Sequence, residues 1–444
     1  MLRRFVIAAV ILAPLAAFAG GGANAAPAPF GNYIVVLNDS VADPGAVAAQ
    51  QASLYGGQVG FIYRYALKGY SVTLPSDQVT ALENNPLVRF VSVNGEVTAA
   101  AKPGPCTDPT QCQITTRAVR RIDGDLSSTR SGDGKGSVNI NVAVLDSGID
   151  VDHPDLNVVG GTDCTQGASS FDDDEGHGTI VAGLIGAKDN NVYIVGVVPG
   201  ARLWAVKVLN KHLSASDGNV ICGVDWVTST RRDADPTNDI AVANMSLGGT
   251  NPHGDDGNCG LTSNDAFHLA LCNSVAAGVT YVVAAGNASA DFQNQKPAAY
   301  NEVLTATAMG DSDGQPGGLG GSNPCIPQQQ DDVFAFFSNF ATLLEDQVHT
   351  VAAPGVCIGS TFPFDGLVAT DSGTSFASPL AAGTVALCIA SGPCAGLTPP
   401  QIVQKIVADA AAYNNAHTGY GFIGDPLRPQ AGKYYGHLIR AGLY

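Results

Sequence analysis

The stretch Ile140–Leu145 reads INVAVL and is followed at once by Asp146-Ser147-Gly148. An apolar run of this length that ends in a glycine-containing turn is typical of a β-strand buried on both faces. Further apolar strands alternate with helical segments along the chain that follows. The predicted strands are Ile140–Leu145, Arg202–Val208, Ile240–Met245 and Val279–Ala284, and the predicted helices are Thr179–Ala187, Gly218–Thr228 and Asp265–Ala277. This alternation predicts an α/β fold in which helices cover both faces of a mainly parallel central sheet.

Residues 33–97 show a different and shorter pattern. In chain order they contain a strand, a helix, two strands, a helix and a last strand. These elements lie at 33–37, 46–55, 60–74 (two strands around Gly69), 75–82 and 88–93. The order βαββαβ predicts a small α+β domain of the ferredoxin-like type. The next segment, Thr98–Pro105, is rich in Ala and Pro, so we expect a weakly structured linker at which proteases cut.

The composition excludes several classes of protein. Of 444 residues, 45% are hydrophobic and 14% are charged, which rules out a disordered tail, a collagen-like fibre and a coiled coil. The formal net charge of −17 repels phosphate backbones and anionic lipid. We therefore expect no nucleic-acid partner and no binding to a membrane.

The N-terminus predicts the compartment. Arg3 and Arg4 precede the apolar run Phe5–Ala19, and small residues that end in Ala23-Asn24-Ala25 follow it. This is the pattern of a secretory signal peptide, and the run is shorter than the roughly 20 residues of a membrane span. Residues 1–25 are therefore predicted to be a signal peptide, and the mature protein is predicted to be secreted, extracellular and unanchored.

The ten cysteines lie between Cys106 and Cys394, and none forms a C-x-x-C pair. In a secreted protein this number favours five disulfides. Short loops favour three pairs and leave the other four cysteines open, including the alternative that two of them stay as free thiols. The favoured pairs are Cys106–Cys112, Cys259–Cys272 and Cys388–Cys394, and the open four are Cys164, Cys222, Cys325 and Cys357.

Three motifs place polar side chains where chemistry can occur. Asp146 follows a buried strand, at the end where open α/β sheets hold their ligands. His177 lies between two glycines at the start of a small-residue helix, and Ser375 precedes the apolar segment Leu380–Ala390, at a helix N-terminus that favours negative charge. Taken singly, each fits a turn, cap or surface residue. Together they give the order Asp, His 31 residues later, and Ser 198 residues after that.

In this order and in neighbouring motifs the sequence resembles the subtilisin-like serine proteases, the subtilases. The resemblance covers most of residues 138–413, and residues 33–97 are similar to the inhibitory propeptide of that family. The further matching motifs are Ser147-Gly148-Ile149, His153-Pro154-Asp155-Leu156, Asn244-Met245-Ser246-Leu247-Gly248-Gly249, Ala284-Ala285-Gly286-Asn287 and Ala353-Pro354-Gly355. The resemblance implies a three-layer subtilisin-like fold preceded by a ferredoxin-like propeptide domain.

The resemblance also implies a catalytic role for four residues. Ser375 would be the nucleophile of an acyl-enzyme mechanism. His177 would take its proton and then protonate the leaving amine, and Asp146 would fix the imidazole tautomer. Asn287 would donate from its side chain to the oxyanion, together with the backbone N–H of Ser375. The implied activity is that of a serine endopeptidase.

Substrate binding is implied at Ser246, Leu247 and Gly248, where an extended peptide would add as a strand through main-chain hydrogen bonds. Main-chain recognition tolerates many side chains, so we expect broad specificity. The sequence leaves the side-chain preference at the scissile bond open. The expected substrates are proteins or peptides.

The chain departs from many relatives at two positions beside the motifs. Ile180 stands where many have His, and Phe376 stands where many have Met, so packing differs while the proton-transfer groups stay intact. The chain between His177 and Ser375 is also longer than in the smaller relatives. We expect the insertions Asn251–Cys259 and Gly310–Asp332 to be surface loops.

We expect no cofactor for the chemistry, since a Ser-His-Asp triad needs none and no H-E-x-x-H zinc motif occurs. A structural calcium ion would fit the family and the acidic composition, but it needs about six to eight oxygens in one place. Asp172-Asp173-Asp174-Glu175 is a candidate, and a solvated acidic loop fits the same residues. The metal ligands therefore stay unknown.

The predicted domains are the signal peptide (1–25), an inhibitor-like propeptide (26–100) and a subtilisin-like peptidase domain (101–444). The propeptide would help a slow-folding parallel sheet to form and would then cap the active site. Its end at Glu96-Val97 would lie in the substrate cleft, with self-cleavage between Val97 and Pro105. We expect a monomeric zymogen that is inhibited by its own propeptide.

Two other functions agree with part of the sequence pattern. A hydrolase of esters or lipids would use the same triad, but no G-x-S-x-G motif surrounds Ser375 and the chain order differs from that fold. A secreted binding or structural protein could keep the fold without the activity. Such a loss would normally show as a substituted triad or oxyanion residue, and all four residues are present.

Overall fold

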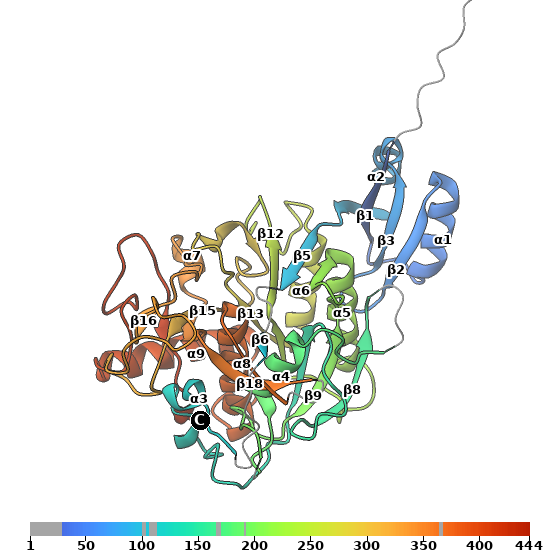
Figure 1. Cartoon of the computed structure of the whole chain (residues 1–444). Coiled ribbons are helices and arrows are strands. Elements are labelled where there is room, and N and C mark those ends of the chain that lie inside the picture. Colours follow the sequence, from blue (N-terminus) through green and yellow to red (C-terminus); the bar gives the residue numbers. More distant parts are fainter. Residues whose placement is uncertain (1–28, 100–103, 106–112, 166–169, 191, 364–366) are drawn as a thin grey trace, which may run out of the picture.

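The structure is a computed structural model that describes residues 29–99, 104–105, 113–165, 170–190, 192–363 and 367–444. Figure 1 shows a small N-terminal domain beside a larger one, with β5 (Glu96–Ala99) reaching from the first into the second. The predicted signal peptide, residues 1–25, and the predicted pair Cys106–Cys112 lie outside the described residues.

The N-terminal domain has the predicted βαββαβ order. Its strands form one antiparallel sheet in the order β2-β3-β1-β4, and a separate apolar core lies between this sheet and its helices. The first helix begins at Pro44 because the Asp43 side chain accepts a hydrogen bond from the Gly45 N–H (2.9 Å). The elements are β1 (Phe30–Leu37), α1 (Pro44–Tyr55), β2 (Gln58–Tyr63), β3 (Gly69–Pro75), the 3₁₀ turn Ser76–Gln78, α2 (Val79–Glu83) and β4 (Val88–Val93).

The larger domain is built on a parallel sheet, as the sequence predicts. Its strands follow the order β20-β17-β15-β13-β11-β7-β9-β8, and β16 (Val333–Phe334) pairs antiparallel with β15. All other strand pairs in this sheet are parallel. The strands are β7 (Asn141–Asp146), β8 (Val158–Asp163), β9 (Arg202–Lys207), β11 (Val242–Met245), β13 (Thr280–Ala284), β15 (Leu304–Gly310), β17 (Thr350–Pro354) and β20 (His437–Leu438).

Helices cover both faces of this sheet and complete the three layers. Along β7, Val142 and Val144 point into one apolar core, and Ala143 and Leu145 point into the other. The helices of the first core are α3 (Arg117–Arg121), α4 (His177–Gly186), α8 (Thr374–Ser391) and α9 (Pro399–Ala416), and those of the second are α5 (Asp217–Thr230) and α6 (Ala266–Ala276). The predicted α/β fold is thus confirmed.

The segment Thr98–Pro105, predicted to be a weakly structured linker, contributes to two strands. Thr98 and Ala99 belong to β5, which lies between β10 (Ser214–Ser216) and β12 (Leu247–Thr250), and β6 (Gly104–Pro105) pairs with β19 (Leu367–Asp371). The prediction was wrong for these residues because composition does not reveal that the edges of other strands offer them hydrogen-bond partners. β12 also pairs with β14 (Gln295–Lys296), and β19 with β18 (Ile358–Phe362).

Four disulfides are present in the described part of the chain. Two of them, Cys259–Cys272 and Cys388–Cys394, were predicted from their short loops and are confirmed. The other two pair the cysteines that the sequence left open, as Cys164–Cys222 and Cys325–Cys357. None of these eight cysteines is a free thiol.

Helix α8 is long and apolar enough to cross a membrane by length and composition, but 83% of it is buried inside the protein. It is the core helix that carries Ser375.

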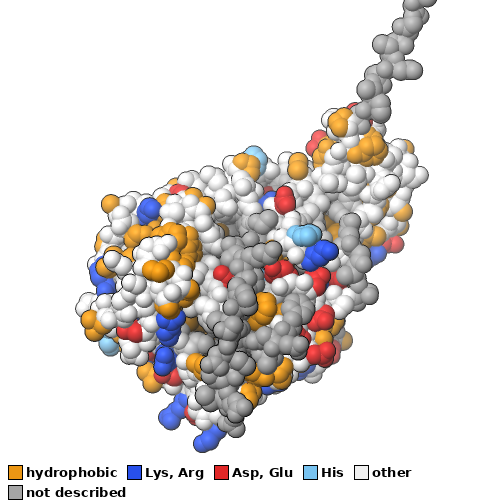
Figure 2. Space-filling model, viewed as in Figure 1, with side chains coloured by type: hydrophobic (Ala, Val, Ile, Leu, Met, Phe, Trp, Pro, Cys, Tyr) orange, Lys and Arg blue, Asp and Glu red, His pale blue; other side chains and the backbone are white. Residues whose placement is uncertain are grey.

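Figure 2 shows apolar side chains gathered on the surface where β16 and α7 (Leu344–Gln347) lie in Figure 1. Exposed apolar residues of this region are Phe336, Leu343, Leu344 and Val348.

Candidate active site

Asp146 and His177 meet at the carboxyl end of the central sheet. Asp146 is the last residue of β7, and His177 is the first residue of α4. The Nδ1 atom of His177 lies 2.8 Å from Asp146 Oδ1, and both side chains are fully buried. The same Asp146 oxygen also accepts the backbone N–H of Ser147 (2.7 Å), which fixes the carboxylate. Within the described residues, His177 Nε2 has no hydrogen-bond partner.

The start of α4 is held by Asp173, a buried residue of the acidic segment 172–175. Its Oδ1 accepts the backbone N–H of Gly176 (2.9 Å), and its Oδ2 accepts the N–H of Thr179 (3.0 Å). Gly176 has a φ of +119°, and a Cβ there would approach the Phe362 ring to 2.5 Å. Asp173 therefore acts as the cap that orients His177, a role that the sequence did not reveal.

The pKa of His177 is raised above its usual value. Burial, the largest single influence, lowers the pKa, but the negative charge and hydrogen bond of Asp146 outweigh it, with smaller contributions from Glu175 and Asp371. Burial in turn raises the pKa of Asp371 to about 6, which the Ser372 N–H and the charge of His177 partly oppose. The ring is thus a stronger base than a free imidazole.

Ser375 lies in the first turn of α8, as the sequence predicts. Its Oγ donates to the backbone carbonyl of Ser246 (3.2 Å), and Ser246 Oγ donates to the Ser375 carbonyl (2.6 Å). Behind this pair, Asn244 Nδ2 donates to Ser246 Oγ (3.0 Å), and Ser378 Oγ donates to Asn244 Oδ1 (2.7 Å). This buried network connects the helix to the end of β11.

Two further contacts join the elements at this point. The ring centroid of Phe376, which follows Ser375, lies 5.6 Å from that of His177. Asn287 Oδ1 accepts both the backbone N–H and the Oγ1–H of Thr374 (2.9 Å each). These bonds direct the amide nitrogen of Asn287 away from Thr374. This nitrogen lies beside Gly373, where a Cβ atom would approach it to 3.1 Å. Thr374 is a second positioning residue that sequence reasoning missed.

The predicted substrate edge is a paired strand in this structure. In β12, Leu247 lies opposite Ala99 and Gly248 lies opposite Thr98, both antiparallel, so that β5 occupies the edge. Beside it, a cavity of about 270 Å³ is lined by Leu247, Gly248, Asn287 and neighbouring residues. The structure thus joins Asp146 to His177, and Ser375 to Ser246, by hydrogen bonds, and Leu247, Gly248 and Asn287 line one cavity. Among the described residues no hydrogen bond joins His177 to Ser375.

The candidate calcium ligands are already engaged in other contacts. Asp173 caps α4 as described, and Asp174 pairs with Lys207 (2.6 Å). A second acidic group, Asp311 with Asp331 and Asp332, is buried in the predicted insertion 310–332. Its carboxylates accept backbone N–H groups of the glycine-rich loop, and Arg121 pairs with two of them. Both groups therefore organise loops.

Comparisons with known proteins identify the family. The Subtilase family model matches residues 137–422. An alkaline protease of Alkalihalobacillus alcalophilus is 29% identical over 86% of this chain and 87% of its own length. A thermostable alkaline protease of Halalkalibacterium halodurans is 31% identical over 78% of this chain and 79% of its own. The crystal structure of a cold-adapted subtilisin-like serine proteinase matches with a TM-score of 0.52 and 25% identity, covering 74% of this chain and 98% of that one.

The fold and these matches define a serine endopeptidase. The chain belongs to the subtilase family.

Proposed function

We propose that Asp146, His177 and Ser375 form the catalytic triad of a peptidase that works through an acyl-enzyme. The observation that carries the proposal is the buried 2.8 Å contact between His177 Nδ1 and Asp146 Oδ1, which leaves Nε2 as the nitrogen that can accept a proton. Ser375 Oγ attacks the carbonyl carbon of the substrate while Nε2 takes its proton. The negatively charged Asp146 stabilises the imidazolium that forms.

The oxyanion of the tetrahedral intermediate lies, in this proposal, between the Asn287 amide and the Ser375 backbone N–H at the start of α8. The intermediate collapses as the C–N bond breaks, and His177 gives its proton to the leaving amine. A water molecule then attacks the ester of the acyl-enzyme in the same way, and the acid product is released. No step needs a metal or a cofactor, and a structural calcium ion would act only on stability.

Peptide substrates are proposed to bind as a strand at Ser246, Leu247 and Gly248. The support is that β5 of this same chain pairs at this edge, with Val97 buried between the flanking strands. Because an antiparallel strand binds mainly through its backbone, the edge accepts many sequences.

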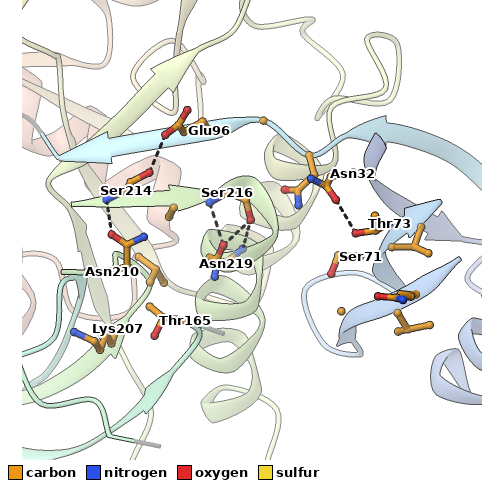
Figure 3. Close-up of a pocket in the computed structure, with 18 of the residues that line it drawn as sticks. Asn32, Ser71, Thr73, Glu96, Thr165, Lys207, Asn210, Ser214, Ser216 and Asn219 are labelled. Atoms are coloured by element: carbon orange, nitrogen blue, oxygen red, sulfur yellow. Dashed lines mark hydrogen bonds between the residues drawn. The ribbon is translucent and has the colours of Figure 1, made fainter. Parts of the chain in front are cut away.

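We further propose that residues 26–100 are an inhibitory propeptide, that 101–444 are the peptidase and that 1–25 direct secretion. The N-terminal domain docks on the start of α5: the Asp217 side chain accepts the Gly95 N–H (2.9 Å), and the Gly218 N–H donates to Asn94 Oδ1 (2.7 Å). Glu96 also accepts a hydrogen bond from Ser214 Oγ (2.8 Å) on the wall of a polar groove of about 950 Å³ between the domains (Figure 3).

The register of β5 supports self-processing. Thr98 opposite Gly248 and Ala99 opposite Leu247 lead the chain toward Ser246, whose carbonyl accepts the Ser375 hydroxyl. We therefore propose that cleavage occurs soon after Ala99, within the segment predicted from sequence. The relatives named alkaline and extracellular proteases, together with the disulfides, support secretion. We propose a monomeric enzyme that binds neither nucleic acid nor membranes.

The test is intact-mass analysis and N-terminal sequencing of the secreted protein, with and without a fluorophosphonate. The proposal expects a product that starts shortly after Ala99 and carries one label on Ser375. The Ser375→Ala variant should remain a full-length precursor and stay unlabelled. Efficient processing of that variant in a protease-free host, or label on another residue, would contradict the proposal.

A further inference from the structure

Two residues between β4 and β5, Asn94 and Gly95, bind the N-terminus of α5. The backbone N–H of Asp217 donates to the Gly95 carbonyl (2.8 Å), and the N–H of Gly218 donates to Asn94 Oδ1 (2.7 Å). The next N–H along the helix donates to the side chain of Ser216 (3.4 Å; Figure 3). Because the first N–H groups of a helix have no partner within it, residues 94 and 95 supply two of the acceptors that α5 needs.

A buried ion pair lies against the same segment. Lys296 Nζ lies 2.7 Å from Asp217 Oδ2, and the two side chains are only 11% and 5% exposed. The same oxygen accepts the Gly95 N–H (2.9 Å), so Gly95 is bound by both its N–H and its carbonyl. Asp217 Oδ1 is buried and has no hydrogen-bond partner among the described residues. The carboxylate therefore depends on Lys296 and on a peptide N–H to offset its burial.

The ion pair leaves no room for a side chain at position 95. A Cβ atom on Gly95 would approach both Asp217 Oδ2 and Lys296 Nζ to 2.9 Å, which is closer than such atoms pack. Moving either atom away would weaken the ion pair in surroundings that water reaches poorly. Gly95 does not adopt a positive φ, so the position fits glycine because of space and not because of backbone conformation.

Asn94 and Gly95 continue the strand that occupies the proposed substrate edge. In β5, Glu96 lies opposite Ser216, the residue directly before α5. A peptide that binds at this edge as β5 does, and extends two residues further, therefore reaches the start of the helix. When the N-terminal domain leaves, two N–H groups of α5 lose their acceptors, and the ion pair loses the segment that covers it.

We propose that the start of α5 and Lys296 form a distal subsite in the processed enzyme. It binds peptide substrates that carry a side-chain oxygen and then a glycine at the positions of Asn94 and Gly95. The assignment rests on the proposed function, in which a substrate lies along β12 as β5 does. The Gly218 N–H takes the side-chain oxygen, and Asp217 holds the glycine through its N–H and its carboxylate. Main-chain recognition at β12 is thus joined by side-chain selection far from the scissile bond.

The first part of the test uses peptides with the sequence of residues 93–105 as substrates of the processed enzyme. The parent peptide is compared with Gly95→Ala and with Asn94→Leu, which keeps the size of the side chain and removes its oxygen. We expect kcat/KM to fall at least about fivefold for Gly95→Ala and about 3- to 10-fold for Asn94→Leu. Val93→Ala is the matched control, because Val93 is 70% exposed, and should stay close to the parent value.

A binding measurement separates the distal subsite from the proposed activity. Acetylated peptides of residues 93–99, with the same substitutions, are titrated into the same enzyme by calorimetry. We expect the dissociation constants to rise in the same order as kcat/KM falls. If no peptide is hydrolysed, the catalytic proposal fails, and the dissociation constants still decide this one. Equal dissociation constants for the parent, Gly95→Ala and Asn94→Leu peptides would overturn the distal subsite, whatever the rates of hydrolysis.

An enzyme variant tests the role of the ion pair. Lys296→Met shortens the side chain by one atom and removes its charge, so the preference for glycine over alanine at position 95 should fall to within about twofold. Lys135→Met, an exposed lysine in the loop before β7, is the matched control and should keep the parent preference. A folded Lys296→Met enzyme with the parent preference would contradict the proposal. If this variant fails to fold, the peptide series with the parent enzyme remains decisive.

Discussion

Asp225 on α5 offers a direct test of how the N-terminal domain is held. Its carboxylate accepts the backbone N–H groups of Arg64 (3.1 Å), Tyr65 (2.6 Å) and Ala66 (2.6 Å), all from the turn between β2 and β3. Asp225 is 8% exposed, so water does not replace these contacts easily. Asp225→Ala removes the acceptor and leaves three N–H groups without a partner in the docked state.

The expected loss follows from the strength of such bonds. A hydrogen bond to a charged group contributes about 1.5–3 kcal/mol, but three bonds that share one carboxylate are not additive. Water that enters the space of the lost carboxylate also recovers part of the loss. We therefore expect docking to weaken by about 2–4 kcal/mol, which corresponds to a roughly 30- to 700-fold higher dissociation constant.

The assay titrates processed enzyme with the wild-type N-terminal fragment and follows peptide hydrolysis. Only the enzyme carries the substitution, so the folding of the fragment is the same in both arms. Glu345→Ala, an exposed carboxylate in α7, serves as the control. The uninhibited rate should not change, because Asp225 lies on the opposite face of the sheet from α4 and α8. An inhibition constant within threefold of the parent value would refute the reasoning.

The pH dependence of this contact has a defined sign. Burial raises the pKa of Asp225 above the ordinary 3.8, although the N–H groups of Ala66, Tyr65 and Arg64 oppose the shift. The folded precursor therefore binds a proton at Asp225 more readily than the unfolded chain does. Through this group the free energy of unfolding is constant above the raised pKa and increases as the pH falls from that pKa toward 3.8. Acidification should thus not unfold the precursor through Asp225.

Three further outcomes are expected. Asn287→Ala should lower kcat about 10²- to 10³-fold with little change in KM in steady-state assays, and wild-type turnover would contradict its oxyanion role. Asp371→Asn removes a charge that raises the pKa of His177, so the acid limb of the kcat/KM profile should move to lower pH; an upward shift would contradict this. Replacing Cys164 and Cys222 by Ser opens a link between residues 58 positions apart and should lower the free energy of unfolding by about 4 kcal/mol, measured by denaturant titration; a loss below about 1 kcal/mol would contradict the estimate.

Local sequence patterns predicted the order of strands and helices in both domains. The apolar run at Ile140–Leu145 became β7 because consecutive apolar residues suit a strand buried on both faces. The βαββαβ order of residues 33–97 was equally visible, since turns and periodicity are properties of near neighbours in the chain. The candidate site residues could be named because the motifs around them are local as well.

Contacts between distant segments were not predictable in this way. The partners of Cys164 and Cys325 depend on which strand ends meet, and no local pattern encodes that. In the sequence, Asp173, which caps α4, looked like part of a solvated acidic loop. The bond from Thr374 to Asn287 joins residues 87 positions apart, and the linker was misjudged because its partners lie in β12.

The sequence by itself determined which segments form strands and helices, and which side chains are chemically able to act. Only the tertiary structure decided how those side chains are paired, buried and charged. The physical reason is that hydrogen-bond geometry and desolvation depend on the atoms that surround a group in space. The 2.8 Å contact of His177 with Asp146 and the 2.9 Å contact of Thr374 with Asn287 exist only once the sheet and its helices have assembled.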